Sequence, residues 1–224
     1  MIIEIWEDVT CPWCYIGERR LEAALEGFPH NSEVQIIRHS FELNPTTPTK
    51  AGKKENMPEM LSTKYGIDLE AATRREAQIA ELAKIEGLTI NPERVVANTR
   101  DAHRMLHLAS DCGLQTALAK LLFAAHFTEG KDISDPDVLM QLMGQVGIEA
   151  NQVRTALAGD AYLAQVEADE HEAQVIGLSG VPLFVVDRRY GMNGAQPTTV
   201  FRELLEKAWE QSTTPTPAVN PSGR

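Results

Sequence analysis

The chain has 224 residues, 43% hydrophobic and 24% charged, and its 32 acidic and 21 basic residues give a formal net charge of −11. A chain of this size and composition can build the core of one large domain, and the excess of acids excludes general binding to nucleic-acid phosphates or to an anionic membrane surface. Three cysteines are too few for a disulfide scaffold.

The first predicted element is a strand over residues 2–9, which are rich in β-branched and aromatic side chains. Its acids interrupt the apolar run that a secretory signal would need. No window of the chain reaches the roughly 18 apolar residues of a membrane span. We therefore expect a cytoplasmic protein that does not associate with membranes.

A helix and a second strand follow. Residues 10–27 predict a turn and then a helix that ends near Gly27, and residues 34–43 alternate with the period of two typical of a strand. Two strands joined by one helix over so short a distance should be parallel, with a right-handed crossover.

The stretch from residue 46 to about residue 177 is almost entirely helical in pattern. Asn56 and Asp135 lie just before prolines, as helix N-caps do, and several glycines stand where helices would end. These signals predict six or seven helices. Residues 87–98 are ambiguous and could be partly extended.

Strand character returns at residues 183–186. A tight connection over residues 187–190 leads to a short strand that ends near Asn193, and Pro197 opens a last helix. Residues 212–224 contain three prolines and no apolar periodicity, which predicts a disordered tail. The order is β-α-β, a long helical insertion, then β-β-α.

Cys11-Pro12-Trp13-Cys14 is the strongest functional signal in the chain. Two cysteines separated by two residues can close a small disulfide ring, and the N–H groups at a helix N-terminus stabilise a thiolate on the first cysteine. Such a thiolate is a nucleophile near neutral pH and a good leaving group. Pro12 suits the first helical turn, and Cys14 would be the more buried, resolving thiol.

Metal binding is the main alternative for a CxxC motif. One such pair is half of a zinc site, and a second half is missing because Cys112 stands alone. His103 and His107 have helical spacing but no third ligand. We therefore predict redox chemistry without a metal, with a structural or vestigial CxxC as the remaining alternative. Cys112 is expected to be a buried or half-buried bystander.

Gly180-Val181-Pro182 leads into the third strand. Proline at the first residue of a strand is tolerated on steric grounds alone. Together with the CxxC motif, it favours a cis Val181–Pro182 bond that leaves the Val181 backbone free to pair with an incoming peptide or thiol and places an apolar ring against the cysteines.

These features resemble the DsbA family of thioredoxin-fold proteins and, more narrowly, its cytoplasmic FrnE-type branch. The similarity extends from residue 3 to about residue 210. Its strongest segments are DVTCPWCYIG (8–17), FELNP (41–45), NTRDAHR (98–104), GLSGVPLF (177–184) and GAQP (194–197).

The resemblance implies a DsbA-like α/β thioredoxin fold, in which a large all-helical insertion interrupts a mixed four-stranded sheet. Residues 1–45 and 178–211 would form a discontinuous thioredoxin-fold domain, residues 46–177 the insertion, and residues 212–224 the tail. The expected sheet order is second, first, third and fourth strand, with the last two antiparallel to the first pair.

The resemblance also implies a dithiol–disulfide oxidoreductase or isomerase, with Cys11 as nucleophile, Cys14 as resolving cysteine and Pro182 as cis-proline. Protein or small-molecule disulfides and thiols would be its substrates, through a mixed disulfide. No cofactor should bind tightly, glutathione is a candidate redox partner, and the chain would be a monomer or homodimer. Trp13 is expected to be exposed beside the thiols.

Two further expectations concern the surroundings of the cysteines. His103 lies in a family-like segment and would help hold a Cys11 thiolate. The buried acid that often stands six residues before the first cysteine is replaced by Ile5, and both Glu4 and Glu7 are expected to point to the opposite face of the strand. Resolution of the mixed disulfide would then be slower, or would use water or another group.

The chain also departs from those FrnE-type proteins that carry an extra cysteine pair near the C-terminus. This chain has no cysteine after Cys112, so it cannot build a second redox relay.

The leading alternative is a glutathione-dependent enzyme of the same superfamily, of the kappa-class transferase or 2-hydroxychromene-2-carboxylate isomerase type. Those relatives typically have serine at the first active-site position and an acid after the last strand, where this chain has Cys11 and Gly194-Ala195-Gln196-Pro197. A binding module or holdase with a methionine-rich surface is a third class, which ordinary core packing of the methionines disfavours.

Overall fold

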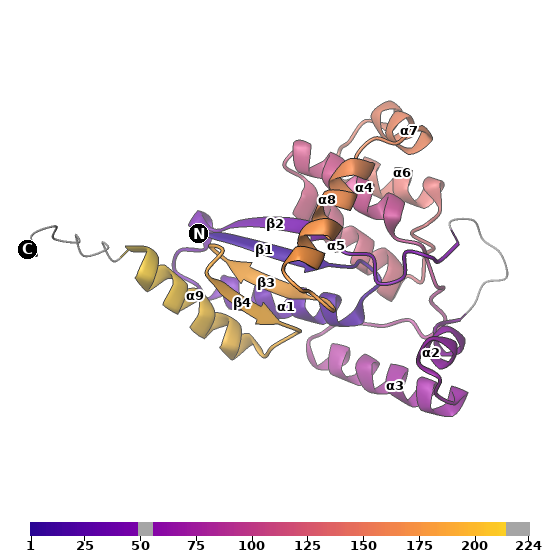
Figure 1. Ribbon diagram of the computed structural model, residues 1–224, viewed down its shortest axis with the longest axis horizontal. Coiled ribbons are helices and arrows are strands. Elements are labelled where there is room, and N and C mark those ends of the chain that lie inside the picture. The colour runs from indigo at the N-terminus through magenta and orange to yellow at the C-terminus, as the bar shows by residue number, and fades with distance from the viewer. Residues whose placement is uncertain (49–55, 214–224) are drawn as a thin grey trace, which may run out of the picture.

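The computed structural model describes residues 1–48 and 56–213, and within them four strands form one mixed sheet (Figure 1). The sheet order is β2-β1-β3-β4, as predicted. The strands are β1 (Ile2–Glu7), β2 (Gln35–Ser40), β3 (Leu183–Val186) and β4 (Tyr190–Asn193).

The strand directions match the prediction except for β4. β1 and β2 are parallel, and β3 is antiparallel to β1. β4 is antiparallel to β3 and therefore runs in the same direction as β1. The expectation that both late strands oppose the first pair is wrong for β4, because the tight connection after β3 reverses the chain once more.

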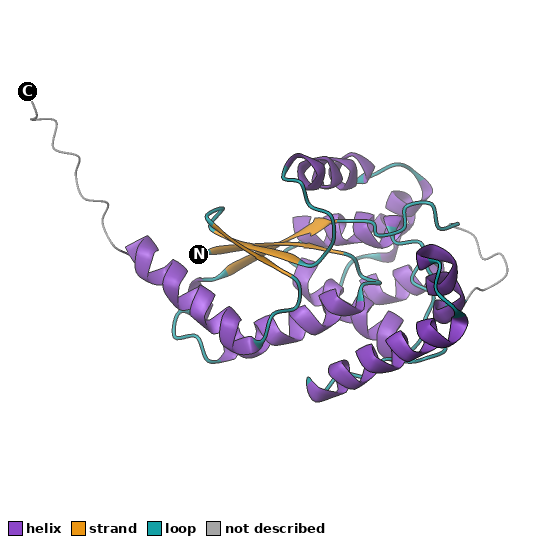
Figure 2. Ribbon diagram, turned by 60° about the horizontal axis from the view of Figure 1, so that its bottom comes forward, coloured by secondary structure: helices purple, strands orange, loops and turns teal. Residues whose placement is uncertain are grey.

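Helices cover both faces of the sheet (Figure 2). On one face lie α1 (Pro12–Glu26) and α9 (Thr198–Thr213), whose apolar side chains pack against those of β1 and β3. This core includes Ile3, Ile5, Leu21, Ala24, Leu25, Phe184, Val186, Phe201, Leu205 and Ala208. On the other face, Trp6 and Leu183 pack against Ala173 of α8 (Leu163–Val175).

The described part of residues 56–177 contains seven α-helices, within the predicted number. Asn56 and Asp135 act as N-caps, since their side chains accept hydrogen bonds from backbone N–H groups, and Gly66 ends a helix in the left-handed conformation. Besides α8, the helices are α2 (Met57–Tyr65), α3 (Leu69–Ile85), α4 (Arg100–Asp111), α5 (Gln115–Phe123), α6 (Pro136–Gln145) and α7 (Ala150–Ala158).

Three irregular segments complete the path of the chain. A short 3₁₀ helix (Asn31–Glu33) precedes β2, and a π-helical turn (Ala124–Thr128) continues α5. The ambiguous residues 87–98 form a loop rather than a helix, and a single antiparallel bridge joins Asn56 to Val95.

A second core lies within the insertion. It is built mainly from apolar residues of α4, α5, α6 and α7, and Val9 also belongs to it. Because Val9 follows β1 and precedes Cys11, the loop that carries the cysteines is held between the sheet and the helices. The division into two domains stays a prediction.

The C-terminal helix continues two residues beyond the predicted boundary. α9 ends at Thr213, and the rest of the predicted disordered tail, residues 214–224, lies outside the described residues. No helix in the described part of the chain is long and apolar enough to cross a membrane.

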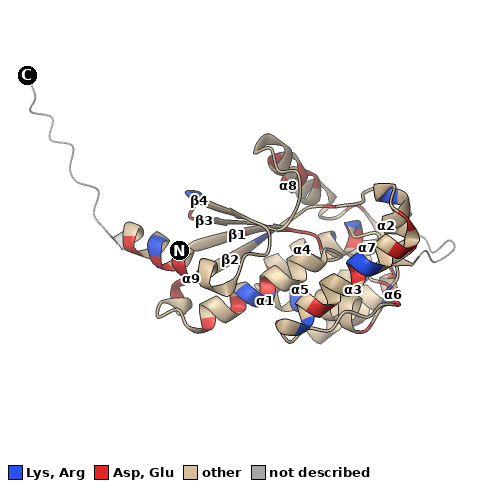
Figure 3. Cartoon of the chain, turned by 90° about the horizontal axis from the view of Figure 1, so that it is seen from below, with Lys and Arg blue, Asp and Glu red and all other residues tan. Residues whose placement is uncertain are grey.

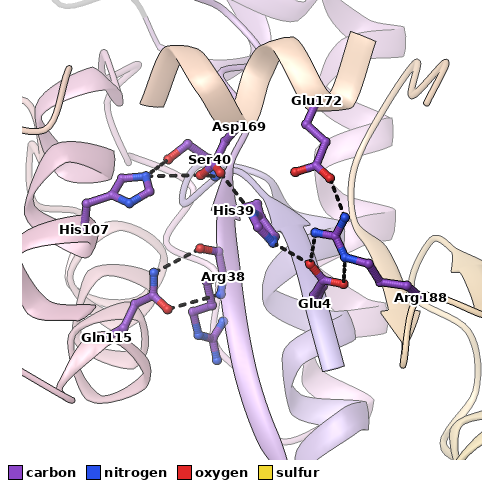
Figure 4. A network of polar contacts seen from close by, with 9 residues as sticks. All are labelled: Glu4, Arg38, His39, Ser40, His107, Gln115, Asp169, Glu172 and Arg188. Atoms are coloured by element: carbon purple, nitrogen blue, oxygen red, sulfur yellow. Dashed lines mark hydrogen bonds and ion pairs between the residues drawn. The ribbon is translucent and has the colours of Figure 1, made fainter. Parts of the chain in front are cut away.

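A polar network joins α8 to the sheet (Figure 4). One carboxylate oxygen of Asp169 accepts a hydrogen bond from the Ser40 N–H at 2.7 Å, and the other lies 2.8 Å from Nδ1 of His39. The opposite ring nitrogen of His39 lies 3.2 Å from Glu4, which also binds the guanidinium of Arg188. Since α8 leads into the segment before β3, this network fixes where that segment begins.

The network shifts the pKa values of its members. Burial lowers the pKa of His39, but hydrogen bonds and charges from Asp169 and Glu4 outweigh burial and raise it overall. Burial raises the pKa of Asp169, but hydrogen bonds from His107, His39 and the Ser40 N–H outweigh burial and lower it overall. The ionised Asp169–His39 pair is therefore favoured in the folded protein.

Replacing Asp169 with asparagine should lower the free energy of unfolding by about 1–3 kcal/mol, because buried partners lose a charged acceptor. The stabilisation from His39 is present below its ordinary pKa of 6.5 and is lost as the pH rises through the raised value. The stabilisation from Asp169 is present above its ordinary pKa of 3.8 and is lost as the pH falls toward the lowered value. The difference in unfolding free energy between wild type and Asp169→Asn should therefore be largest between the two ordinary pKa values, 3.8 for Asp169 and 6.5 for His39.

Chemical denaturation at several pH values measures this difference. Glu167→Gln, an exposed acid on the same helix, is the matched control and should leave stability unchanged. A difference that stays constant from pH 5 to pH 8 would contradict the assignment.

Candidate active site

The two cysteines lie at the start of α1. Cys11 is the N-cap and Pro12 the first helical residue, so the missing N–H of proline costs nothing. The Cys11 carbonyl accepts hydrogen bonds from the N–H groups of Cys14 and Tyr15, at 3.0 and 3.1 Å. Both cysteines are buried free thiols, whereas Trp13 between them is 39% exposed. The predicted exposure of Trp13 is confirmed.

The segment before β3 is remote from Cys11 in sequence but lies next to it in the structure. The Cys11 thiol donates a hydrogen bond to the carbonyl of Val181 at 3.6 Å, and the Val181–Pro182 bond is cis, as predicted. Gly17 allows this close approach. A Cβ atom at position 17 would lie 3.1 Å from the Phe184 ring and 3.4 Å from Cγ of Pro182.

The environment of the Cys14 thiol holds its proton in place. The pKa of Cys14 is raised well above its usual value, first by burial, then by its hydrogen bond to the Cys11 sulfur and by the negative charges of Cys11 and Glu7. Cys14 therefore keeps its proton at neutral pH and donates it to the Cys11 sulfur. Cys14 is thus the thiol that resists deprotonation.

A buried ion cluster lies beneath the dithiol. Arg38 of β2 donates one hydrogen bond to Glu7 of β1 at 2.7 Å and another to Glu18 of α1 at 2.5 Å, and all three side chains are buried. The charges of Glu18 and Glu7 raise the pKa of Arg38 despite its burial. The guanidinium is therefore a permanent cation shared by two carboxyl groups.

The position of Glu7 corrects a sequence expectation. Glu4 does point away from Ile5, since it binds His39 and Arg188 on the other face. Glu7, two residues after Ile5, lies on the same face as Ile5, toward α1. Strand alternation, counted correctly, would have found a buried acid at this position.

Glu7 titrates near neutral pH. Burial raises its pKa to about 7, the Arg38 guanidinium opposes this rise, and the charge of Glu18 adds to it. A carboxyl group that exchanges its proton near pH 7 is suited to general acid–base chemistry. Its charge also raises the pKa of Cys14, which shows that the two groups interact.

His103 lies behind the active-site loop. It is buried, and its Nε2 is 3.9 Å from Oδ1 of Asp8. Burial lowers the pKa of His103, so the imidazole is neutral near pH 7 and forms no ion pair there. Within the described residues neither ring nitrogen has a hydrogen-bond partner. The role of His103 in holding a thiolate stays a prediction.

Asp8 shapes the loop that precedes the cysteines. Its Oδ1 accepts hydrogen bonds from the N–H and hydroxyl of Thr10, both at 3.0 Å, and its Oδ2 accepts one from the Leu43 N–H at 2.7 Å. These contacts tie the end of β1 to the chain after β2, which fixes the approach to Cys11.

A cavity of about 660 Å³ opens beside Cys11. Cys11, Trp13 and Val181 form one side, and α2 and α3 supply most of the other. The apolar part of the helical wall contains Met57, Met60, Leu61, Ile79 and Leu82. The sequence did not reveal this wall, because it depends on how α2 and α3 fold back over the dithiol.

Neither Cys112 nor a histidine lines the cavity. Cys112 is exposed at the C-terminal end of α4, so the expectation that it is buried or half-buried is wrong. The helix ends at the surface at this position. Among the described residues, no group of three or more histidine, cysteine or acidic side chains is arranged to hold a metal ion.

Comparison with known families agrees with this geometry. A model of the DSBA-like thioredoxin domain matches residues 2–206. The chain belongs to this family. The crystal structure of a "probable DsbA oxidoreductase" from Streptomyces coelicolor is 39% identical to this DSBA-like chain, with a TM-score of 0.89, and the match covers all of this chain and 97% of that one.

Two more distant structures share the DSBA-like fold. The cytosolic disulfide reductase DsbM from Pseudomonas aeruginosa, solved with GSH, is 20% identical, with a TM-score of 0.64 over 94% of this chain and 100% of DsbM. A 2-hydroxychromene-2-carboxylate isomerase is 14% identical, with a TM-score of 0.70 over 95% of this chain and 98% of that one. At such identities the likeness shows the fold alone, which does not separate disulfide exchange from isomerisation.

Proposed function

We propose that the protein is a thiol–disulfide oxidoreductase in which Cys11 and Cys14 form the redox-active pair. The observation that carries this proposal is the asymmetry of the two thiols. Cys11 caps a helix beside the cavity, whereas burial and the charges around Cys14 hold its proton in place. An attacking thiol and a protected second thiol are what a two-step exchange requires.

The proposed reaction begins when the Cys11 thiolate attacks one sulfur of a substrate disulfide. The substrate S–S bond breaks, one half leaves as a thiolate, and the other half stays bound to Cys11 as a mixed disulfide. Cys14 then loses its proton and attacks the Cys11 sulfur, which releases the second half as a thiolate. The substrate gains two electrons, the dithiol loses two, and the reverse sequence oxidises a substrate dithiol.

Val181 and Trp13 are placed to contact the substrate in this reaction. The Val181 carbonyl already accepts a hydrogen bond from the Cys11 thiol, so it marks the path along which a substrate sulfur approaches. Trp13 is the exposed aromatic side chain between the cysteines and lines the same cavity. Pro12 and Pro182 complete the polypeptide surface around the sulfurs without adding a hydrogen-bond donor.

We infer that Glu7 receives the proton of Cys14 during resolution. Its carboxyl group is buried, has a pKa of about 7 and interacts electrostatically with Cys14. When the mixed disulfide forms, the negative charge on Cys11 disappears, which removes one cause of the raised pKa of Cys14. An ionised Glu7 can then take the proton, and Arg38 stabilises Glu7 in its charged form.

The other expectations keep the status of predictions. The glutathione-dependent alternative shares the fold. The paired cysteines beside the cavity nevertheless support disulfide exchange over a site that binds a glutathione sulfur without exchanging it. Glutathione as redox partner, isomerase activity, the FrnE-type assignment, the cytoplasmic location and the monomeric or homodimeric state stay predictions.

Replacing each cysteine separately tests the assigned roles. Cys11→Ser should reduce insulin-disulfide reduction to the background rate, because the nucleophile is gone. Cys14→Ser should accumulate one substrate half per chain as a mixed disulfide, visible by intact mass spectrometry. Cys112→Ala is the control and should keep wild-type activity, and full activity of Cys11→Ser would refute the proposal.

Replacing Glu7 with glutamine tests the proton transfer. In the wild type, resolution should accelerate as the pH rises through about 7, because Glu7 then becomes able to accept a proton. Glu7→Gln should resolve the mixed disulfide about 100-fold more slowly near pH 7, and its rate should rise only where Cys14 ionises by itself. The measurement is single-turnover release of the second substrate thiol.

Glu18→Gln is the matched control for this test. It removes the other carboxylate from Arg38 but keeps Glu7 as the proton acceptor. Because the charge of Glu18 raises the pKa of Glu7, Glu18→Gln should move the pH dependence of resolution to lower pH without abolishing the step. If Glu7→Gln and Glu18→Gln slow resolution equally, or if Glu7→Gln keeps the step near pH 7, Glu7 does not accept the proton.

A further inference from the structure

The cavity wall has the opposite charge from the chain as a whole. Three of its lining residues are basic (Lys64, Arg75 and Arg94), and one is acidic (Glu76), so the wall has a formal charge of +2. The chain has a net charge of −11. Figure 3 shows basic and acidic positions side by side on α2 and α3, so the cationic excess belongs to the residues that line the cavity and not to these helices as a whole. A local excess of cations in an acidic protein favours anionic ligands at that place.

The three basic side chains differ in how many hydrogen bonds and ion pairs they already form within the protein. Arg94 is buried, donates to Glu76 and to the carbonyl of Asn91, and stacks over the Phe127 ring at 5.4 Å. It therefore helps to build the wall and neutralises Glu76. This leaves Lys64 and Arg75 as the source of the net positive charge.

Arg75 is the basic residue that is free to bind a ligand. It is exposed, and within residues 1–48 and 56–213 the structure gives its guanidinium no hydrogen bond or ion pair. Lys64 uses part of its capacity, since its ammonium group donates to the carbonyl of Leu43 and to the side chain of Asn44. Each ammonium has three donors, so Lys64 can take one further anionic contact.

The dimensions of the cavity favour a small substrate. Its volume of about 660 Å³ lies within the range of pockets that enclose small molecules, and its apolar side chains can cover a short aliphatic chain. Cys11 lines the same cavity as Arg75 and Lys64, on the side opposite α2 and α3. One molecule can therefore contact the reactive sulfur and the basic groups together.

We propose that the cavity selects disulfides of small carboxylate-bearing thiols, with Arg75 and Lys64 binding the carboxylate while Cys11 attacks the sulfur. This inference rests on the proposed oxidoreductase function and names the substrate class of that site. A guanidinium binds a carboxylate through two parallel hydrogen bonds. Because Arg75 is exposed, its contribution should appear mainly in substrate capture and should weaken as the ionic strength rises.

Three small disulfides of similar length test the proposal: 3,3′-dithiodipropionate, with two carboxylates, bis(2-hydroxyethyl) disulfide, which is neutral, and cystamine, with two ammonium groups. The kcat/KM of the wild type, normalised to the rate of each disulfide with a simple thiol, should be highest for the dicarboxylate and lowest for cystamine. Arg75→Glu should lower kcat/KM for the dicarboxylate about three- to tenfold and leave the neutral disulfide nearly unchanged.

Arg74→Glu is the matched control. Arg74 is the preceding residue on α3, is exposed, pairs with Glu70 and does not line the cavity. Its replacement changes the net charge of the chain by the same amount and should preserve the preference for the dicarboxylate. Equal normalised rates for all three disulfides, or equal effects of Arg74→Glu and Arg75→Glu, would overturn the proposal while leaving the exchange reaction intact.

A binding measurement separates failure of this proposal from failure of the proposed function. The thioether 3,3′-thiodipropionate carries the same carboxylates and has no disulfide to exchange. In an NMR titration it should bind the wild type and Arg74→Glu and bind Arg75→Glu more weakly. If no disulfide is exchanged but the thioether binds in this pattern, only the oxidoreductase function is refuted; if the thioether shows no dependence on Arg75, the ligand class is refuted.

Discussion

Two carboxyl groups share one guanidinium beneath the active site, and the position of the dithiol depends on this arrangement. Arg38, Glu7 and Glu18 come from β2, β1 and α1. Removing charges from water is costly, and each member of the cluster is tolerable only while its partners stay in place. The cluster therefore specifies how α1 sits on the sheet, and with it the position of Cys11 at the start of α1.

The same cluster links structure to acid–base chemistry. Burial raises the pKa of Glu7 to about 7, and the charge of Glu18 adds to this rise because one guanidinium does not fully compensate two buried carboxylates. In the mechanism that we propose, this buried carboxyl group between β1 and α1 accepts the proton of Cys14. The family often places such an acid six residues before the first cysteine, and here the residue four before it occupies the same face of β1.

The other half of the site comes from the far end of the sequence. The network of Asp169 and His39 fixes α8 on the sheet, α8 leads to the cis Val181–Pro182 segment, and Gly17 lets that segment approach α1. The insertion therefore does two things. It positions the segment opposite Cys11, and through α2 and α3 it supplies a cavity wall whose charge differs from that of the remaining chain.

Local signals were sufficient to predict much of this fold. Cys11 and Cys14 and the caps at Asn56 and Asp135 follow from residues that are neighbours in sequence. The cis bond before Pro182 was predicted only in combination with the distant CxxC motif. The direction of β4 was missed because the hairpin turn reverses the chain a second time.

Errors and omissions occur where side-chain direction or long-range packing decides. The face of Glu7 required correct counting along the strand, and the exposure of Cys112 depends on where α4 ends at the surface. The Arg38 cluster, and the cavity with Arg75 in its wall, join elements that are remote in sequence, so no local sequence pattern predicts them.

The central claim is that Cys11, which lines the cavity, reacts while Cys14 keeps its proton. Limited alkylation of the reduced Cys112→Ala protein, followed by peptide mass spectrometry at several pH values, tests it directly. We predict that near pH 7 the label is found on Cys11 alone and that Cys14 is labelled only at higher pH, because burial raises its pKa. Labelling of Cys14 at the same rate as Cys11 near pH 7 would contradict the account.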